Sequence, residues 1–175
     1  MEVKSMVLPT FENLKPDKQN RIRNSLLNEF SNYPLAEAQV ARIVSNAGIS
    51  RGAFYKYFED LTDAYNYIFD IAMFQIHQEM PKTPNASNVD EYVESIRHFV
   101  SGTDKKGYKD LIEKHYRYNE GFLGSEPTKL RLSDDSYSTW AVTVLYHQTV
   151  RDIVLDPVNI EQRIEQLRKV LRKAY

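Results

Sequence analysis

The chain has 175 residues, of which 42% are hydrophobic, so it can form the core of one moderate domain or two small ones, and default disorder is excluded. Its 23 basic and 24 acidic residues give a net charge of −1, which excludes a general basic coat for nucleic acid and requires any such partner to meet a local patch. The absence of cysteine excludes disulfides and thiolate metal sites.

The first predicted element is a helix over residues 16–31. Pro16 and Asp17 mark its start, because proline at the first helical position and an acid in the first turn both favour a helix N-terminus. A second, shorter helix is expected over residues 36–46, where apolar residues recur at helical spacing. Gly48 then supplies a tight corner that only glycine makes cheaply.

A third helix is predicted over residues 51–57, directly after this corner. Ser50 is its expected N-cap, since a serine hydroxyl accepts a hydrogen bond from the free amides of a first helical turn. Two short helices joined by a tight corner form a helix-turn-helix, in which the second helix can lie in a DNA major groove. Phe54 is expected to face inward, and the hydroxyl and cationic side chains beside it face outward.

The rest of the chain is predicted to be helical as well. Asp60 paired with Asp63 resembles an N-terminal cap for a long helix that ends near Pro81, and the turn-forming residues 81–88 make the clearest linker. Pro157 is expected to open the last helix. The helices between them are expected over residues 89–101, 105–119 and 134–155.

The segment 39–58, QVARIVSNAGISRGAFYKYF, resembles the helix-turn-helix of the TetR family of bacterial transcriptional regulators. The shared features are the Ala-Gly-Ile-Ser corner and the ending Gly-x-Phe-Tyr-x-x-Phe, and the resemblance extends over about residues 16–70. It implies an all-α homodimer with a three-helix helix-turn-helix head, residues 1–59, and a divergent helical domain, residues 60–175, for effector binding and dimerisation. The charge agrees, at +3 for residues 1–58 (8 basic, 5 acidic) and −4 for residues 59–175 (15 basic, 19 acidic).

Outward side chains of the third helix are the candidate DNA contacts, because cations and hydroxyls there can reach phosphates and base edges. The resemblance places Tyr55 and Tyr57 against the DNA backbone. Ala38, Gln39 and Leu61 stand where the family usually has phosphate-binding threonine and lysine residues, and Arg42 is expected to replace one of these contacts. The predicted DNA-binding residues are Arg42, Ser50, Arg51, Gly52, Tyr55, Lys56 and Tyr57.

The aromatic and apolar residues after the head allow two interpretations: ordinary core, or an effector cavity and a dimer surface. The resemblance raises the effector cavity as a rival to ordinary core, and it favours the dimer surface, because family dimers use their last two helices. Both of these helices are apolar on more than one side here. The candidate effector-binding residues are Phe69, Met73, Phe99, Tyr116 and Trp140, and the candidate dimer residues are Trp140, Val144, Ile153, Ile160, Ile164, Leu167 and Leu171.

Signals for catalysis, metal or cofactor are missing from the sequence. The four histidines lack metal-site spacing, and no glycine-rich phosphate loop or nucleophile elbow occurs. No apolar run approaches the roughly 20 residues of a membrane span, and the first ten residues lack the apolar stretch of a signal peptide, so we expect a cytoplasmic protein.

The sequence therefore predicts a non-enzymatic regulator that binds a near-palindromic DNA operator as a homodimer. Its expected mode is that of a repressor released by a small-molecule effector. The alternative is a helix-turn-helix co-regulator or adaptor whose C-terminal domain binds a protein partner.

Overall fold

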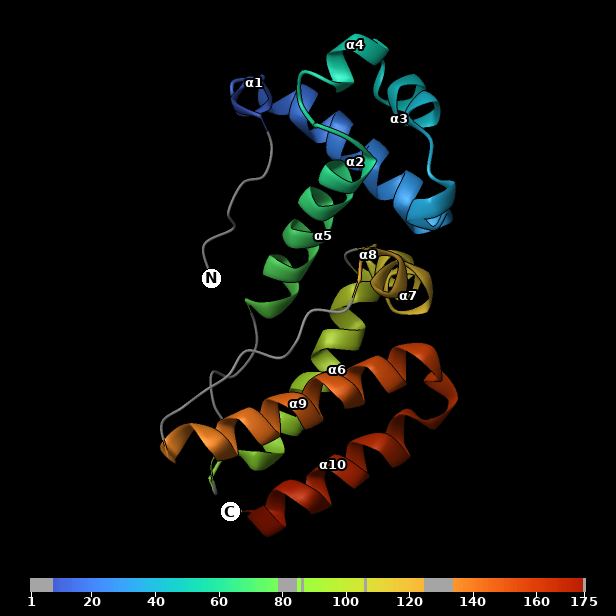
Figure 1. Cartoon of the computed structure of the whole chain (residues 1–175). Coiled ribbons are helices and arrows are strands. Elements are labelled where there is room, and N and C mark those ends of the chain that lie inside the picture. The colour runs from blue at the N-terminus through green and yellow to red at the C-terminus, as the bar shows by residue number, and fades with distance from the viewer. Residues whose placement is uncertain (1–7, 79–84, 86, 106, 125–133, 175) are drawn as a thin grey trace. The chain divides into compact units, whose positions relative to one another are not determined.

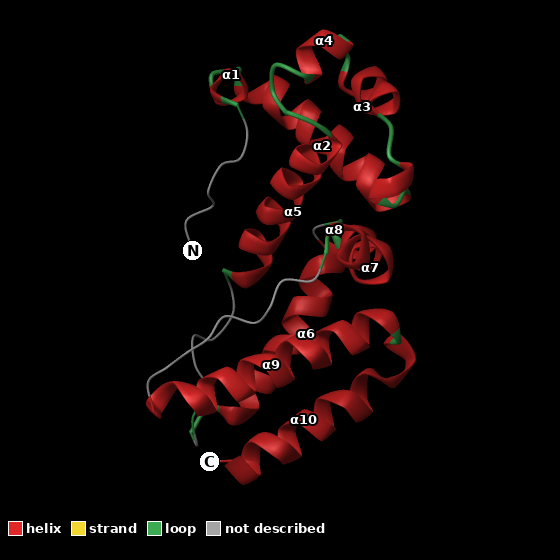
Figure 2. Ribbon diagram, viewed as in Figure 1, coloured by secondary structure: helices red, strands yellow, loops and turns green. Residues whose placement is uncertain are grey.

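The computed structural model describes residues 8–78, 85, 87–105, 107–124 and 134–174, with only the backbone considered at 101–105 and 134–139. Every regular element in these ranges is a helix and none is a strand, which confirms the all-α prediction (Figure 2). None of the described helices is both long and apolar enough to cross a membrane. The helices are α1 Pro9–Glu12, α2 Pro16–Asn32, the 3-10 helix η1 Leu35–Glu37, α3 Val40–Ala47, α4 Arg51–Phe54, α5 Leu61–His77, α6 Val89–Lys105, α7 Lys109–Lys114, the π-helix η2 His115–Asn119, α8 Glu120–Leu123, α9 Asp134–Leu155, the 3-10 helix η3 Pro157–Asn159 and α10 Ile160–Ala174.

The chain divides into two compact units, and each is made of two separate stretches of sequence. The first unit contains residues 1–75 and 107–123, and the second contains residues 76–106 and 124–175. This division differs from the boundary predicted at residues 59/60. The reason is that most of α5, together with α7 and α8, packs with the head rather than with the later helices.

The core of the first unit lies where α2 meets α3, α5 and α7 (Figure 1). The Phe30 ring on α2 contacts the Tyr65 ring on α5 edge-on, with centroids 5.2 Å apart. Leu111 and Ile112 of α7 are almost completely buried. Four-residue helix α1, which the sequence patterns did not predict, adds Phe11 to this core with 1% of its surface exposed.

Most predicted helix bounds agree with the structure to within a few residues, but two predicted helices are divided. Residues 36–46 form η1 and then α3, because Gln39 is extended and its N–H donates to the Glu29 carboxylate on α2 at 2.7 Å. Residues 105–119 form α7 and the π-helix η2. Of the predicted linker 81–88, residues 81–84 and 86 lie outside the described ranges.

The second unit is built from α6, α9 and α10. Its buried side chains include Ile96 of α6, Ile153 of α9 and Ile164 of α10, each with no exposed surface. Ion pairs fix α10 along α6. Arg168 binds Glu94 at 2.6 Å, and Asp90 accepts from Arg172 at 2.9 Å.

Candidate nucleic-acid interface

The corner between α3 and α4 is formed by Gly48 in a left-handed conformation, with φ 64° and ψ 43°. The Ile49 N–H turns back to the Val44 carbonyl at 3.0 Å, which satisfies a free carbonyl at the end of α3. A side chain with a Cβ costs about 1–2 kcal/mol in this backbone region, so the glycine is what makes the turn tight. The predicted corner is therefore confirmed.

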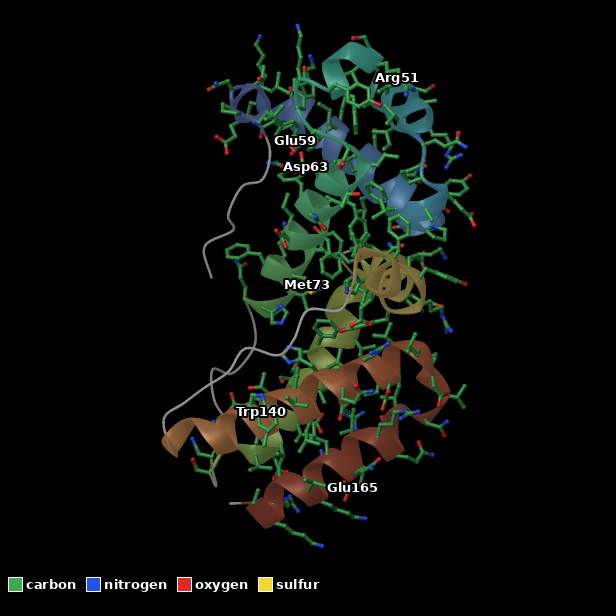
Figure 3. The ribbon with its side chains drawn as sticks, viewed as in Figure 1. Arg51, Glu59, Asp63, Met73, Trp140 and Glu165 are labelled. Carbon is green, nitrogen blue, oxygen red and sulfur yellow. The ribbon has the colours of Figure 1, made fainter. Side chains whose placement is uncertain are left out.

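The short helix α4 is fixed at its start and at its inner face. The Ser50 hydroxyl accepts a hydrogen bond from the Ala53 N–H at 3.1 Å, as the capping prediction required. Phe54 is fully buried and anchors α4 to the head, while Arg51, Gly52 and Lys56 are exposed. Figure 3 shows Arg51 on α4, at the edge of the head. The α4 segment thus has one side held in the core and one side open to a partner.

The outward side combines a cation, an aromatic hydroxyl and an open backbone. The Arg51 guanidinium donates to the Tyr55 hydroxyl at 3.3 Å and makes no ion pair among the described residues. Tyr55 is 45% exposed. A Cβ built on Gly52 meets nothing within 4 Å, so a partner can approach the backbone there. An unpaired cation beside an exposed hydroxyl suits phosphate oxygens.

Tyr57 lies elsewhere than predicted. It is only 5% exposed, because α4 ends at Phe54 and the following turn rotates Tyr57 into the core instead of along the outward face. There its ring meets the edge of Phe11, with centroids 5.8 Å apart, and Lys18 Nζ lies 5.7 Å from its centroid. The expectation of an outward Tyr57 was therefore wrong, since it assumed that the helix continues to residue 57.

Arg42 has a structural partner that the sequence patterns did not indicate. Its guanidinium donates to the Glu29 carboxylate through Nε, at 2.9 and 3.0 Å, and through Nη2, at 2.6 Å, and lies 3.8 Å over the Tyr33 ring. The Glu29 side chain is 1% exposed, so the pair joins α3 to α2 inside the head. The hydrogen bond that Arg42 donates to Glu29 raises the pKa of Arg42 further above its ordinary value. The Arg42 guanidinium is thus already engaged by Glu29, and its role as a DNA contact stays a prediction.

A hollow of about 540 Å³ lies beside this outward side, between the start of α3, α4 and the start of α5. Arg51 of α4 and Tyr55 just after it line the hollow, together with Gln39 just before α3 and Thr62 of α5. Asp60 also lies there, but its carboxylate accepts from the Asp63 N–H at 2.8 Å, as predicted for the α5 cap. Thr62 lies in the first turn of α5, a position that the predicted contacts did not include.

This arrangement of helices can be compared with known proteins. No protein-family model matches the chain, and neither does any curated protein. Among solved structures, the chain is similar to a TetR family transcriptional regulator from Chloroflexus aurantiacus J-10-FL, with 19% identity and a TM-score of 0.55 over 97% of this chain and 98% of that one. The chain has the TetR fold.

Within this TetR fold, the candidate effector residues are divided between the two units. Phe69, Met73 and Tyr116 belong to the first unit, whereas Phe99 and Trp140 belong to the second. Phe69 stacks on the ring of His115, with centroids 4.1 Å apart, so part of its surface is already used in packing. The five residues are therefore not brought together inside one unit, and an effector role for them stays a prediction.

The candidate dimer residues of the TetR fold also fall into two groups. Ile153, Ile164 and Leu171 are fully buried and Leu167 is 3% exposed, because the α10 stripe packs on α6 and α9 of the same chain. These four cannot offer contact area to a second chain. Ile160 is partly exposed, and the more exposed apolar residues of α9 and α10 are Trp140, Val144, Leu145 and Val170.

A buried amide links the π-helix η2 to the 3-10 helix η1, between α2 and α3. Asn119 is fully buried, and its Oδ1 accepts a hydrogen bond from the Leu35 N–H at 2.8 Å across 84 positions of sequence. Its Nδ2 makes no hydrogen bond among the described residues. In the same π-helix, His115 Nδ1 lies 2.8 Å from the Tyr65 hydroxyl on α5. Single π turns inside helices often mark functional sites, and this one directs two polar side chains at different elements of the first unit.

Proposed function

We propose that the protein is a sequence-specific DNA-binding transcriptional regulator of the TetR type. One observation carries the proposal. The buried Phe54 anchors α4 to the head, yet Arg51, Gly52, Tyr55 and Lys56 remain exposed beside an open backbone. A cation, a hydroxyl and an uncrowded helix start are what a major groove and its phosphates require.

The four residues have different roles in this proposal. Lys56 and the Tyr55 hydroxyl bind backbone phosphates, which positions the protein but reads no sequence. Arg51 is the residue placed to reach a base edge, because its planar donors can pair with guanine in the major groove. Gly52 lets the DNA approach α4 closely.

The hollow at the start of α3 is the proposed binding site for a further phosphate. The family's usual threonine and lysine contacts are absent here, and we infer that Gln39 and Thr62 supply donors in their place, next to Arg51. The free N–H groups of the first turn of α3 support this inference, since an α-helix N-terminus attracts negative charge.

We further propose that two copies act together on a near-palindromic operator. Two α4 segments one helical turn apart, about 34 Å, would enter successive major grooves. The exposed Trp140 and Val144 of α9 are the proposed contact between the copies. A small effector that binds one arrangement of the dimer more tightly than the other would release the operator and make the protein a repressor.

The test is a selection of DNA from a random duplex pool, followed by affinity measurements on the enriched sequence at several salt concentrations. Lys56→Ala should weaken binding to all sequences and reduce the salt slope by about one. Arg51→Ala should cost about 1–3 kcal/mol and relax preference at one base position. Tyr55→Phe, which retains the ring, should lose only the phosphate contact.

The matched control is Lys169→Ala, which removes the same charge from an exposed position on α10 of the second unit. If no duplex is enriched, or if Lys56→Ala behaves as Lys169→Ala does, the α4 side is not a DNA-reading surface.

A further inference from the structure

The first unit contains a groove between α2 and α5 that is separate from the outward side of α4. Its volume is about 410 Å³, and Tyr108, just before α7, also lines it. Along α5 its wall is apolar, with Ile71 half-buried and Phe74 38% exposed. Pockets of this size hold small organic molecules.

Arg23 gives this groove a positive charge, and none of the described residues neutralises it. The guanidinium donates to the Tyr67 hydroxyl at 2.7 Å, to the Gln19 side-chain carbonyl at 3.2 Å and to the Asn20 side-chain carbonyl at 3.4 Å. All three acceptors are neutral, and no carboxylate pairs with Arg23 among the described residues. Arg42, on the neighbouring helix α3, is by contrast paired with Glu29. An arginine stays protonated in proteins, so the half-buried Arg23 remains a cation.

The donors left on Arg23 define what the groove can bind. A guanidinium has five N–H groups, and the three hydrogen bonds leave two of them. Two N–H groups on one cation match the two oxygens of one carboxylate. None of the described residues that line the groove is acidic, so nothing among them repels such an anion. Asn24 and Gln75 add amide groups at its rim.

We propose that the α2–α5 groove binds an amphipathic carboxylate, a small molecule with one carboxylate and an apolar tail. The carboxylate pairs with Arg23, and the tail covers Leu27, Ile71 and Phe74. Burial of the tail supplies affinity, and the charge supplies selectivity. Binding at this groove does not depend on DNA recognition. Any effect of the ligand on operator affinity rests on the proposed function.

The experiment titrates octanoate, and separately 1-octanol, into the full chain by calorimetry without DNA. Octanoate should bind with one site per chain, and the neutral alcohol should bind at least tenfold more weakly. Asn20→Asp should then reduce octanoate affinity at least tenfold and leave the alcohol unchanged. The reason is that the new carboxylate lies where the amide oxygen of Asn20 now accepts from Arg23. It therefore pairs with Arg23 and neutralises the charge that would hold the ligand.

The control is Asn32→Asp, which adds the same charge at an exposed position of α2 that does not line the groove, and it should bind octanoate as the original chain does. Phe74→Ala should weaken the binding of both ligands, because it removes part of the apolar lining of the groove. The proposal is overturned if octanoate does not bind the original chain, or if Asn20→Asp binds it equally well. Because DNA is absent, neither result bears on the role of α4.

Discussion

Replacing Asn119 by alanine should loosen the connection between the π-helix η2 and the loop before α3. In the structure, the Asn119 Oδ1 is the acceptor for the Leu35 N–H at 2.8 Å, and both residues are buried. The alanine removes the only side-chain acceptor that the Leu35 N–H has among the described residues. Since Leu35 is 5% exposed, water does not readily replace it.

The magnitude follows from the two polar groups involved. A buried donor left without a partner costs about 1–3 kcal/mol. Removal of the Asn119 Nδ2, which has no hydrogen bond among the described residues, recovers part of this cost. We therefore expect the free energy of unfolding to fall by about 1–2 kcal/mol, which corresponds to a decrease in Tm of about 2–8 °C for a chain of this length.

The assay is urea unfolding followed by circular dichroism, together with amide hydrogen exchange at Leu35. Exchange at this amide should become faster in Asn119→Ala, whereas the amides inside α2 should keep their protection. Tyr118→Ala is the control, because Tyr118 precedes Asn119 in the same π-helix and is 52% exposed. That change should stay within about 0.5 kcal/mol. Equal stability and equal Leu35 exchange in the two variants would refute the reasoning.

Two further predictions concern the glycines of the head and the ion pairs of the second unit. Gly48→Ala should lower the free energy of unfolding by about 1–2 kcal/mol, because φ is 64° at this residue. Gly52→Ala should raise it by about 0.5 kcal/mol, because Gly52 lies on a helix and an added Cβ there meets nothing. Urea unfolding midpoints would separate the two variants, and equal effects would contradict the left-handed turn at Gly48. A hydrogen bond from Arg172 lowers the pKa of Asp90, and one from Arg97 lowers the pKa of Glu161. These pairs therefore stabilise the folded state at pH values above the unfolded carboxyl pKa, which is near 4. Their contribution is lost as the pH falls through the lower pKa of the folded state. Unfolding measured from pH 6 to pH 2 should show a shallower decline for Asp90→Asn than for the original chain, and an unchanged decline would show that the Asp90 pair has no role in acid stability.

The sequence was sufficient to predict the elements that depend on local signals. Pro16 and the apolar spacing after it predicted α2, and Gly48 and Ser50 predicted the corner and the cap with their correct roles. These features need only neighbouring residues, because a left-handed glycine and a serine cap act within one turn of the backbone.

The site residues that were placed differently depend on partners far away in the sequence. Tyr57 turns inward because Phe11 of an unpredicted helix receives it, and Arg42 is held because Glu29 lies buried opposite. Neither partner stands at a spacing that marks it. The contact between Asn119 and Leu35 spans 84 positions, and periodicity within one helix cannot reveal it. Tertiary packing therefore decided which polar side chains stay available for a partner.

The interleaved composition of the first unit has a consequence for how the protein is made. A ribosome releases residues 1–75 early, but α7 and the π-helix, which complete that unit, come only after all of α6 has been synthesised. At about 5–20 residues per second, the nascent chain spends seconds with the α2 surface that α7 later covers still open to solvent. A fragment cut at residue 59 would retain that open surface permanently, so a stable form of the first unit must include the stretch up to residue 123.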